Sequence, residues 1–418
     1  MEINKKKVLI VVGGFPIISQ TFIMNQMVSL LDEGFLIKIF SYKVGDLKKQ
    51  HHSVKKYDLL NKVTYRRKPF KSGIKRYLYL FRFLIFNCLK LDFSLLFYSL
   101  NFFKHGKKAT SLELFFENEF FIKNNNFDII HVHFGVNAKQ IVRLKEHGFL
   151  KKSKLIVSFH GFDLNPSKID FYKTDYKLLF KHANFLTVNT VYTQNILLEV
   201  NSNLKNIVLL PESYDANVFN LESSFKKPQS KTFKIVYCGR LVPFKGSVLL
   251  PKIVLELHKR NIKNIEINVI GDGVLKDTLQ QLVATSKLTD HIKLLGVQSQ
   301  KNIADIFKNS HAFLLPGVYD KSDGRAENQG LVIQEAAAMG LPVIVSDVGG
   351  MKYGLIPNET GIVVAENDIE GFADAVQKLI ENPAITQEMG AKGREYAVNN
   401  YNAKYLIKKL IKVYNRDN

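Results

Sequence analysis

Two carboxylates lie close together in the second half of this 418-residue chain, with a glycine between them. Residues 323–350 read DGRAENQGLVIQEAAAMGLPVIVSDVGG, which places Glu327 and Glu335 eight residues apart around Gly330. Gly330 lets the backbone approach a ligand closely, and the alanine-rich run 331–339 favours a helix. The start of such a helix suits phosphates, because its N–H groups lack partners and its dipole is positive there. Two flanking carboxylates could accept hydrogen bonds from hydroxyl groups, so the pattern describes a nucleotide-sugar better than a free nucleotide.

Taken alone, Glu327 and Glu335 could equally be two solvent-exposed charges, and the surrounding residues favour a binding site. An apolar run, 341–345, follows the helix and ends in Ser-Asp-Val-Gly-Gly. The whole block resembles the donor site of family-four retaining glycosyltransferases of the GT-B fold, in which a Glu-x7-Glu pair binds the donor. By that resemblance Glu327 contacts the transferred sugar and Glu335 contacts the ribose. The backbone N–H groups that would hold the diphosphate belong to Gly330, Leu331 and Val332.

Two cations are expected on the same ligand. Arg240 ends the predicted strand 234–238, and Lys245 follows five residues later, at the start of an expected helix. Ligands of open α/β sheets bind at the carboxyl ends of strands, where these cations could neutralise a departing diphosphate. The family has Gly-Arg and Lys here, so the resemblance gives both residues the diphosphate-binding role. The glycines expected near the donor on this side are Gly239, Gly271 and Gly273, although the Gly-Asp-Gly turn is equally well explained as a turn alone.

Further candidates lie in the first half of the chain. Gly13 and Gly14 follow the first predicted strand and would let the backbone approach the diphosphate or the acceptor. The string FPIISQTFIMNQ resembles the opening of the polysaccharide-synthesis branch of the family, with Gln20 in place of an acidic residue. The expected acceptor-side residues are Ser19, Thr21, Asn25 and Asp163.

His160 begins the string His-Gly-Phe-Asp at the end of a predicted buried strand. The resemblance makes it the residue closest to the reacting sugar, where its polar ring could hold a hydroxyl group. His131 and His133 alternate on a strand, but no third ligand has suitable spacing for zinc. The family needs no bound cation, so we expect no metal, and no cofactor beyond the nucleotide-sugar co-substrate.

Alternating apolar and helical stretches predict an α/β chain with doubly wound parallel sheets. The resemblance implies the GT-B fold, two Rossmann-like domains facing a central cleft. We expect an acceptor-binding domain over 1–220, a linker over 221–232 and a nucleotide-sugar-binding domain over 233–400, with the helix 401–418 packing back on the first. The predicted strands are 8–12, 36–41, 129–134, 155–159, 185–188, 207–210, 234–238, 265–270, 292–295, 312–315, 342–345 and 361–364.

The net charge of +21 is concentrated in the first 220 residues, which hold 33 Lys and Arg against 17 Asp and Glu. Residues 62–108 hold 12 Lys and Arg, one acid, Asp92, and 12 aromatic residues. This mixture fits nucleic acid, an anionic membrane surface or a solvated lysine-rich face, and its helical spacing favours the membrane. Its longest uncharged run, 93–103, is too short to span a bilayer, and no nucleic-acid motif accompanies the charge, so we expect no nucleic-acid partner.

The chain contains two cysteines far apart, Cys88 and Cys238, which fits a reducing compartment. Residues 1–18 fit a first strand better than a secretory signal, because Gly13, Gly14 and Pro16 interrupt the apolar run. We therefore expect a cytoplasmic protein, peripherally associated with the inner face of the cell membrane.

The resulting hypothesis is a retaining, metal-independent glycosyltransferase. It would move a hexose-type sugar from a nucleotide diphosphate to a lipid-linked glycan of a bacterial surface polysaccharide, such as a capsule or lipopolysaccharide. The expected catalytic residues are His160, Glu327, Arg240 and Lys245. Two alternatives are a nucleotide-sugar epimerase of the same fold, and a non-enzymatic membrane-binding or nucleic-acid-binding protein with a degenerate transferase fold. One departure from the family concerns Pro211-Glu212-Ser213, which stands where relatives have Pro-Asn-Gly.

Overall fold

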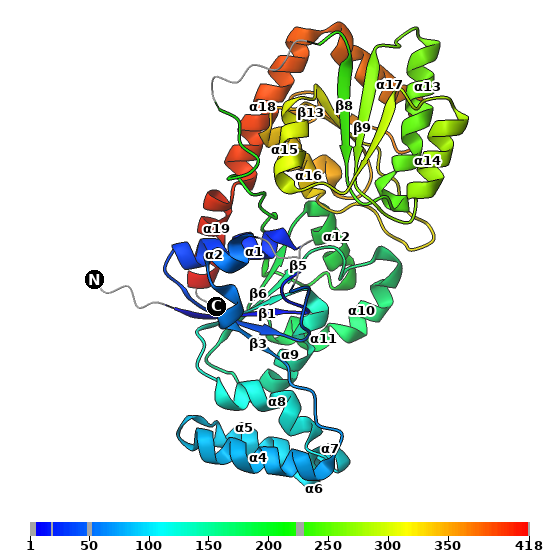
Figure 1. Cartoon of the computed structure of the whole chain (residues 1–418). Coiled ribbons are helices and arrows are strands. Elements are labelled where there is room, and N and C mark those ends of the chain that lie inside the picture. The colour runs from blue at the N-terminus through cyan, green and yellow to red at the C-terminus, as the bar shows by residue number, and fades with distance from the viewer. Residues whose placement is uncertain (1–5, 18–19, 48–51, 223–229, 417–418) are drawn as a thin grey trace. The chain divides into compact units, whose positions relative to one another are not determined.

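The computed structural model describes residues 6–17, 20–47, 52–222 and 230–416, and it contains two parallel β-sheets with helices around them (Figure 1). One sheet has seven strands in the order β3-β2-β1-β4-β5-β6-β7, and the other has six in the order β10-β9-β8-β11-β12-β13. The predicted α/β class with two doubly wound parallel sheets is confirmed.

The inner strands of the first sheet are apolar and buried on both faces, as is typical of parallel sheets, whereas the edge strands β3 and β7 have no buried residue. Its inner strand β1 pairs in parallel with β2 and β4, so that Val8 lies between Ile37 and Ile129. Strand β3 was not predicted, because its three residues lie inside the basic, aromatic segment. The strands are β1 Lys7–Val12, β2 Leu36–Ser41, β3 Val63–Tyr65, β4 Ile129–His133, β5 Lys154–Phe159, β6 Phe185–Val188 and β7 Ile207–Leu209.

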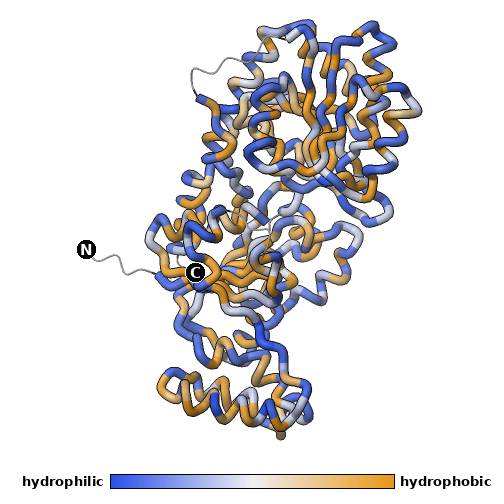
Figure 2. Tube along the Cα trace, in the orientation of Figure 1, coloured by the Kyte–Doolittle hydropathy of each residue, from blue (hydrophilic) through white to orange (hydrophobic). Residues whose placement is uncertain are grey.

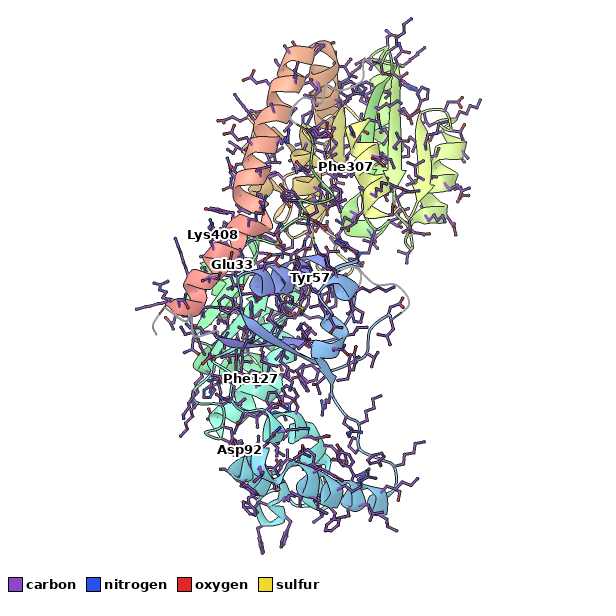
Figure 3. The ribbon with its side chains drawn as sticks, turned by 60° about the vertical axis from the view of Figure 1, so that its left-hand side comes forward. Glu33, Tyr57, Asp92, Phe127, Phe307 and Lys408 are labelled. Carbon is purple, nitrogen blue, oxygen red and sulfur yellow. The ribbon has the colours of Figure 1, made fainter. Side chains whose placement is uncertain are left out.

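The second sheet matches the predicted strands to within one residue at each end. Its core is a continuous cluster of buried aliphatic and aromatic side chains from both faces of the sheet, and Phe307, labelled in Figure 3, is one of them. The strands are β8 Phe233–Cys238, β9 Ile265–Ile270, β10 Ile292–Gly296, β11 Ala312–Leu315, β12 Val343–Ser346 and β13 Gly361–Val364. The helices among these strands are α13 Leu250–Lys259, α14 Lys276–Thr285, α15 Gln300–Lys308, α16 Leu331–Ala338 and α17 Ile369–Glu381.

The helices between β3 and β4 form a layer of their own in the same part of the chain as the first sheet. We call residues 73–110 the helical layer; it contacts α8 Glu113–Lys123, chiefly through α5 and α7 (Figure 1). Asp92, labelled in Figure 3, caps α5 by accepting a hydrogen bond from Leu95 N–H and another from the Asn125 amide. In the described residues, no helix combines the length and apolarity needed to cross a membrane. The layer comprises α4 Gly73–Asn87, α5 Phe93–Leu100, α6 Phe102–His105 and α7 Lys107–Thr110.

The remaining helices between β1 and β7 follow individual strands. They are α1 Thr21–Asp32, α2 His52–Lys56, α3 Leu59–Lys62, α9 Lys139–Glu146, α10 Ile169–Asp175, α11 Lys177–His182 and α12 Val191–Val200.

The expected C-terminal helix 401–418 corresponds to α19, Ala403–Asn415, and a longer helix, α18, precedes it. Helix α18, Pro383–Tyr401, ends at Asn402, whose extended backbone (ψ 136°) breaks the helix, and α19, Ala403–Asn415, follows. Near the end of α19 the Tyr414 hydroxyl lies 2.7 Å from His131 Nδ1 on β4.

Contacts divide the described chain into two compact units. Unit 1 comprises residues 1–159, 173–187 and 413–418, and unit 2 comprises 160–172 and 188–412. This division does not follow the predicted boundary at residue 220, and the predicted domain limits 1–220 and 233–400 stay a prediction. Most of the predicted linker 221–232 lies outside the described residues.

Candidate active site

Lys245 occupies the centre of the candidate site in unit 2. It ends the short 3₁₀ turn Pro243–Lys245 after β8, five residues before α13 begins at Leu250, so the expectation that it lies at the start of a helix is wrong. The left-handed Gly246 (φ 66°) turns the chain there, and a Cβ at Gly246 would lie 1.7 Å from Pro316 O. The Lys245 ammonium forms an ion pair with the carboxylate of Glu327, and both side chains are nearly buried, at 11% and 13% exposed.

Glu335 is the second carboxylate beside Lys245. It lies on α16, one turn inside the helix, as predicted. Removal from water and the neighbouring charge of Asp215 raise the pKa of Glu335 to about 8, while Lys245 acts in the opposite direction. Burial, and then the nearby Glu335, likewise raise the pKa of Cys238 to about 12. The site therefore holds one lysine that pairs with Glu327 and acts electrostatically on Glu335, and a pKa of about 8 keeps Glu335 largely neutral at pH 7.

The start of α16 presents free backbone donors next to Glu327. Gly330 precedes the helix with φ 64°, a left-handed conformation that a side chain would strain. A Cβ there would also lie 3.3 Å from Glu327 Cγ. In the described part of the chain, the N–H groups of Leu331 and Val332 have no hydrogen-bond acceptor, whereas Ile333 N–H bonds to Gly330 O. This is the arrangement expected for an anion at a helix start.

The loop that carries Arg240 is supported by the Gly-Asp-Gly turn after β9. Gly271 (φ 134°) approaches so closely that a Cβ there would lie 1.9 Å from Gly239 O. Leu241 N–H donates to Asp272 O at 2.9 Å, and a Cβ at Gly273 would lie 2.5 Å from Leu241 O. The turn therefore positions the Arg240 loop by backbone contact. Arg240 itself is exposed.

His160 lies in the same unit as Glu327 and has a carboxylate partner. Its Nδ1 is 2.9 Å from Glu212 Oε1, and both side chains are nearly buried. The Asn189 amide donates to the same Glu212 oxygen at 3.2 Å. A carboxylate at Nδ1 fixes the orientation of the ring and directs Nε2 away from Glu212. Asp163, expected on the acceptor side, is buried and accepts the backbone N–H of His160 at 3.0 Å, which fixes the loop after β5.

A network of polar side chains connects His160 to the loop before α16, and sequence reasoning did not find it. The Asn328 side-chain oxygen accepts hydrogen bonds from the hydroxyls of Thr190 and Thr193, each at 2.7 Å. The Gln329 side chain accepts a hydrogen bond from the backbone N–H of Glu212 and donates one to the backbone carbonyl of Glu212. The adjacency of Asn328 and Gln329 to Glu327 was visible in the sequence, but partners more than 100 residues distant were not.

Known proteins share this chain's sequence pattern and its fold. Residues 220–396 match the family described as glycosyl transferases group 1. The chain is 25% identical to the amylovoran biosynthesis glycosyltransferase AmsK of Erwinia amylovora, over 96% of this chain and 97% of that protein. It is 22% identical to the putative colanic acid biosynthesis glycosyltransferase WcaL of Salmonella typhimurium, over 95% and 96% of the two chains. The structure of HepE from Anabaena in complex with UDP is similar, with a TM-score of 0.71, 13% identity and 97% and 98% coverage.

The chain is a glycosyltransferase of the GT-B fold. The resemblance inferred from the Glu-x7-Glu block is confirmed. Neither an epimerase nor a degenerate, non-enzymatic fold is favoured by these similarities.

The glycosyltransferase carries its remaining candidate residues in unit 1. A Cβ at Gly13 would lie 3.2 Å from the Asn137 side chain, and one at Gly14 would lie 3.0 Å from Ile17. Thr21 begins α1, and Asn25 is buried on it. Ser19 lies outside the described residues. The predicted contacts of these residues with donor or acceptor stay predictions.

The two histidines on β4 of the glycosyltransferase contact other protein side chains and each other. His131 is buried, with Nδ1 2.7 Å from the Tyr414 hydroxyl and Nε2 2.7 Å from Ser158 Oγ. Its ring stacks on that of His133 at 4.6 Å. Both nitrogens of His131 are therefore used by hydroxyl groups. Within the described ranges, no cluster of three or more His, Cys, Asp or Glu is arranged to hold a metal ion.

Proposed function

We propose that this glycosyltransferase moves a sugar, with retention of configuration and without a metal ion, from a nucleotide diphosphate to a lipid-linked glycan. The acceptor would belong to a bacterial exopolysaccharide, since AmsK and WcaL are named for amylovoran and colanic acid synthesis. The observation that carries the proposal is the position of Lys245, which pairs with Glu327 and acts electrostatically on Glu335, beside the free N–H groups that begin α16.

The donor would bind through its diphosphate at this helix start. The N–H groups of Leu331 and Val332, together with Arg240 and Lys245, would supply positive charge to the diphosphate without a metal ion. HepE, of the same fold, has been crystallised with UDP. In the free protein Lys245 is held by Glu327, so an arriving diphosphate would compete for the ammonium. Glu335, largely protonated near neutral pH, can both donate to and accept from the ribose hydroxyls.

The chemical step would be attack from the face that the diphosphate leaves. The bond from the anomeric carbon to the phosphate oxygen breaks, a bond to the acceptor hydroxyl oxygen forms, and the departing phosphate oxygen takes the hydroxyl proton. Arg240, Lys245 and the α16 N–H groups would stabilise the charge that develops on the leaving diphosphate. His160, oriented by Glu212, would hold a hydroxyl group of the transferred sugar.

The lipid part of the acceptor motivates a membrane location. The helical layer contributes most of the basic and aromatic residues of 62–108, and many of its large apolar side chains are exposed. We propose that it associates with the anionic inner surface of the cell membrane.

The test begins with thermal shifts by UDP, GDP, ADP and their sugar conjugates, because a ligand that binds the folded state raises the melting temperature. A shift with one nucleotide family selects the donor for a transfer assay with membrane lipid extract in EDTA. Arg240→Ala and Glu327→Ala should each lower transfer by about 100-fold. The exposed Lys259→Ala, on α13 of the same unit, should not. Full turnover in both site variants, or a product with inverted anomeric configuration by NMR, would overturn the proposal.

A further inference from the structure

The helical layer carries a stripe of exposed apolar side chains. On α4 the large side chains recur at helix spacing, and Ile74, Leu78, Phe81 and Ile85 are between 55% and 75% exposed. Phe103 on α6 is 89% exposed. Figure 2 shows this concentration of apolar residues along α4 to α6, at the bottom of the view. An exposed apolar surface of this kind marks a site of interaction.

A cavity of about 740 Å³ lies behind α4, also in unit 1. The inner face of α4, strands β2 and β3 and the end of α8 contribute to its lining. Five cationic side chains line it: Lys38, Arg67, Lys75, Arg82 and Lys123. Glu119 is the one carboxylate of the lining among the described residues.

The positive charge of this cavity is not neutralised by the protein. Glu119 is already occupied, because it pairs with Arg67 at 3.2 Å and accepts a hydrogen bond from the Tyr79 hydroxyl. Across the described ranges, no carboxylate forms an ion pair with the other four cations of the lining.

Two of these cations are close enough to repel each other. Partial burial, and then the charge of Lys123, lower the pKa of Lys38. The Lys38 ammonium donates to the Asn124 side chain and lies 5.5 Å from the centre of the Phe120 ring. Like charges held together in a partly buried lining favour an anion between them.

The cavity and the apolar face meet on α4. Leu78 and Phe86 both line the cavity and are also 59% and 76% exposed. A ligand that filled the cavity with an anionic group would therefore place any attached chain directly on the apolar face. We propose that this cavity binds the phosphate headgroup of a membrane lipid, with the hydrocarbon chain lying along the exposed stripe of α4.

A lipid satisfies both features, whereas a soluble phosphate would leave the apolar face uncovered. The proposal rests on the membrane association put forward under Proposed function, and it adds a defined headgroup site to that association. Every residue involved belongs to unit 1, whereas Arg240, Lys245, Glu327 and Glu335 belong to unit 2.

The test is sedimentation of the full-length protein with phosphatidylcholine vesicles that contain or lack phosphatidylglycerol. A cavity variant, Lys75→Gln/Arg82→Gln/Lys123→Gln, is compared with Lys104→Gln/Lys107→Gln/Lys108→Gln. The control removes the same charge from exposed positions of the helical layer that do not line the cavity. We expect binding to phosphatidylglycerol vesicles to weaken at least about tenfold more in the cavity variant than in the control.

Several results would overturn the headgroup site. Equal losses in the two variants would indicate a diffuse electrostatic attraction. Absence of vesicle binding by the parent protein would exclude the membrane. A thermal shift by inorganic diphosphate that is lost in the cavity variant while vesicle binding persists would indicate a site for soluble phosphate. The thermal shift caused by nucleotide should be the same in both variants as in the parent, which would show that the variants are folded. If the parent protein shows no nucleotide shift, the result counts against the proposed donor binding and not against the headgroup site.

Discussion

At the scale of single residues, the candidate donor site is a balance between one lysine and two carboxylates. The Lys245–Glu327 ion pair is nearly buried, so both charges have lost most of their contact with water. The attraction between the two charges compensates for that loss. The same pair must open or be shared when a diphosphate binds. Lys245 would supply positive charge to the diphosphate, and Glu327 holds the lysine side chain in position while no diphosphate is bound.

A double-mutant cycle should reveal this dependence. Lys245→Met and Glu327→Gln should each lower the free energy of unfolding by about 1–2 kcal/mol, because each leaves the other partner unpaired. Their combination should cost less than the sum, with a coupling of about 1 kcal/mol. Urea unfolding of the four proteins measures these values. Additive effects would show that the ion pair contributes nothing to stability.

Glu335 should make stability depend on pH. Its pKa is raised from the usual 4.5 to about 8, so between these values the unfolded chain has released a proton that the folded protein keeps. The unfolded state then binds fewer protons, and stability falls as the pH rises through this window. Glu335→Gln, which cannot ionise, should gain on the parent as the pH rises from 4.5 to 8, by up to about 5 kcal/mol.

Unfolding free energies of the two proteins at several pH values measure this gain. Asp215, Lys245 and Cys238 are the ionisable groups near Glu335, and they are unchanged in the variant. A constant difference between the two proteins across the window would contradict the shifted pKa.

Residue types and spacing, together with the family resemblance, predicted Glu327, Glu335, Arg240, Lys245 and His160 as candidates, and the structure places all five in one unit. Sequence reasoning missed the partners that hold them. Glu212, which orients His160, lies 52 residues away along the chain, and only the fold brings the two together. Likewise, nothing in the sequence shows that Lys245 pairs with Glu327, because that contact joins the loop after β8 to the loop before α16.

At the scale of elements, the start of α16 depends on the conformation of Gly330. Gly330→Ala would force a side chain into a left-handed backbone and against Ile333 and Glu327, at 3.0 Å and 3.3 Å. Gly34→Ala is a matched control, since Gly34 also has a positive φ (85°) but open space around its Cβ position. Both variants should lose about 1 kcal/mol of stability from the backbone conformation.

Gly330→Ala alone should also weaken the nucleotide thermal shift, because the displaced Glu327 and helix start belong to the candidate site. Equal nucleotide thermal shifts in Gly330→Ala and Gly34→Ala would show that the conformation of Gly330 does not affect donor binding.

Strands were the most predictable elements, because parallel strands buried on both faces are short apolar runs between turn residues. The exceptions have local causes. Strand β3 has three residues, none of them buried, so it carries no apolar run. The 3₁₀ turn at Lys245 delays α13 to Leu250.

At the scale of the whole molecule, charge and ligand chemistry are divided between the two units. The donor-site candidates of unit 2 combine a helix start with two cations, which is the arrangement we propose for the diphosphate, whereas unit 1 holds the helical layer and its basic cavity. The chain itself passes from unit 2 to unit 1 at residues 412 and 413, near the end of α19. The last turn of α19 is therefore expected to contribute to the stability of unit 1.

Tyr414 allows a test of that contribution. It is fully buried, and its hydroxyl bonds to His131, whose other nitrogen bonds to Ser158 on β5. Tyr414→Phe keeps the ring and leaves one buried ring nitrogen without its partner, which should cost about 1–3 kcal/mol. Thermal unfolding should show a lower melting temperature, and Tyr405→Phe, at a 42% exposed position of the same helix, should show no change. Because the donor-site candidates lie in unit 2, the nucleotide thermal shift of Tyr414→Phe should keep its size; a lost shift would mean that donor binding depends on how α19 ends in unit 1.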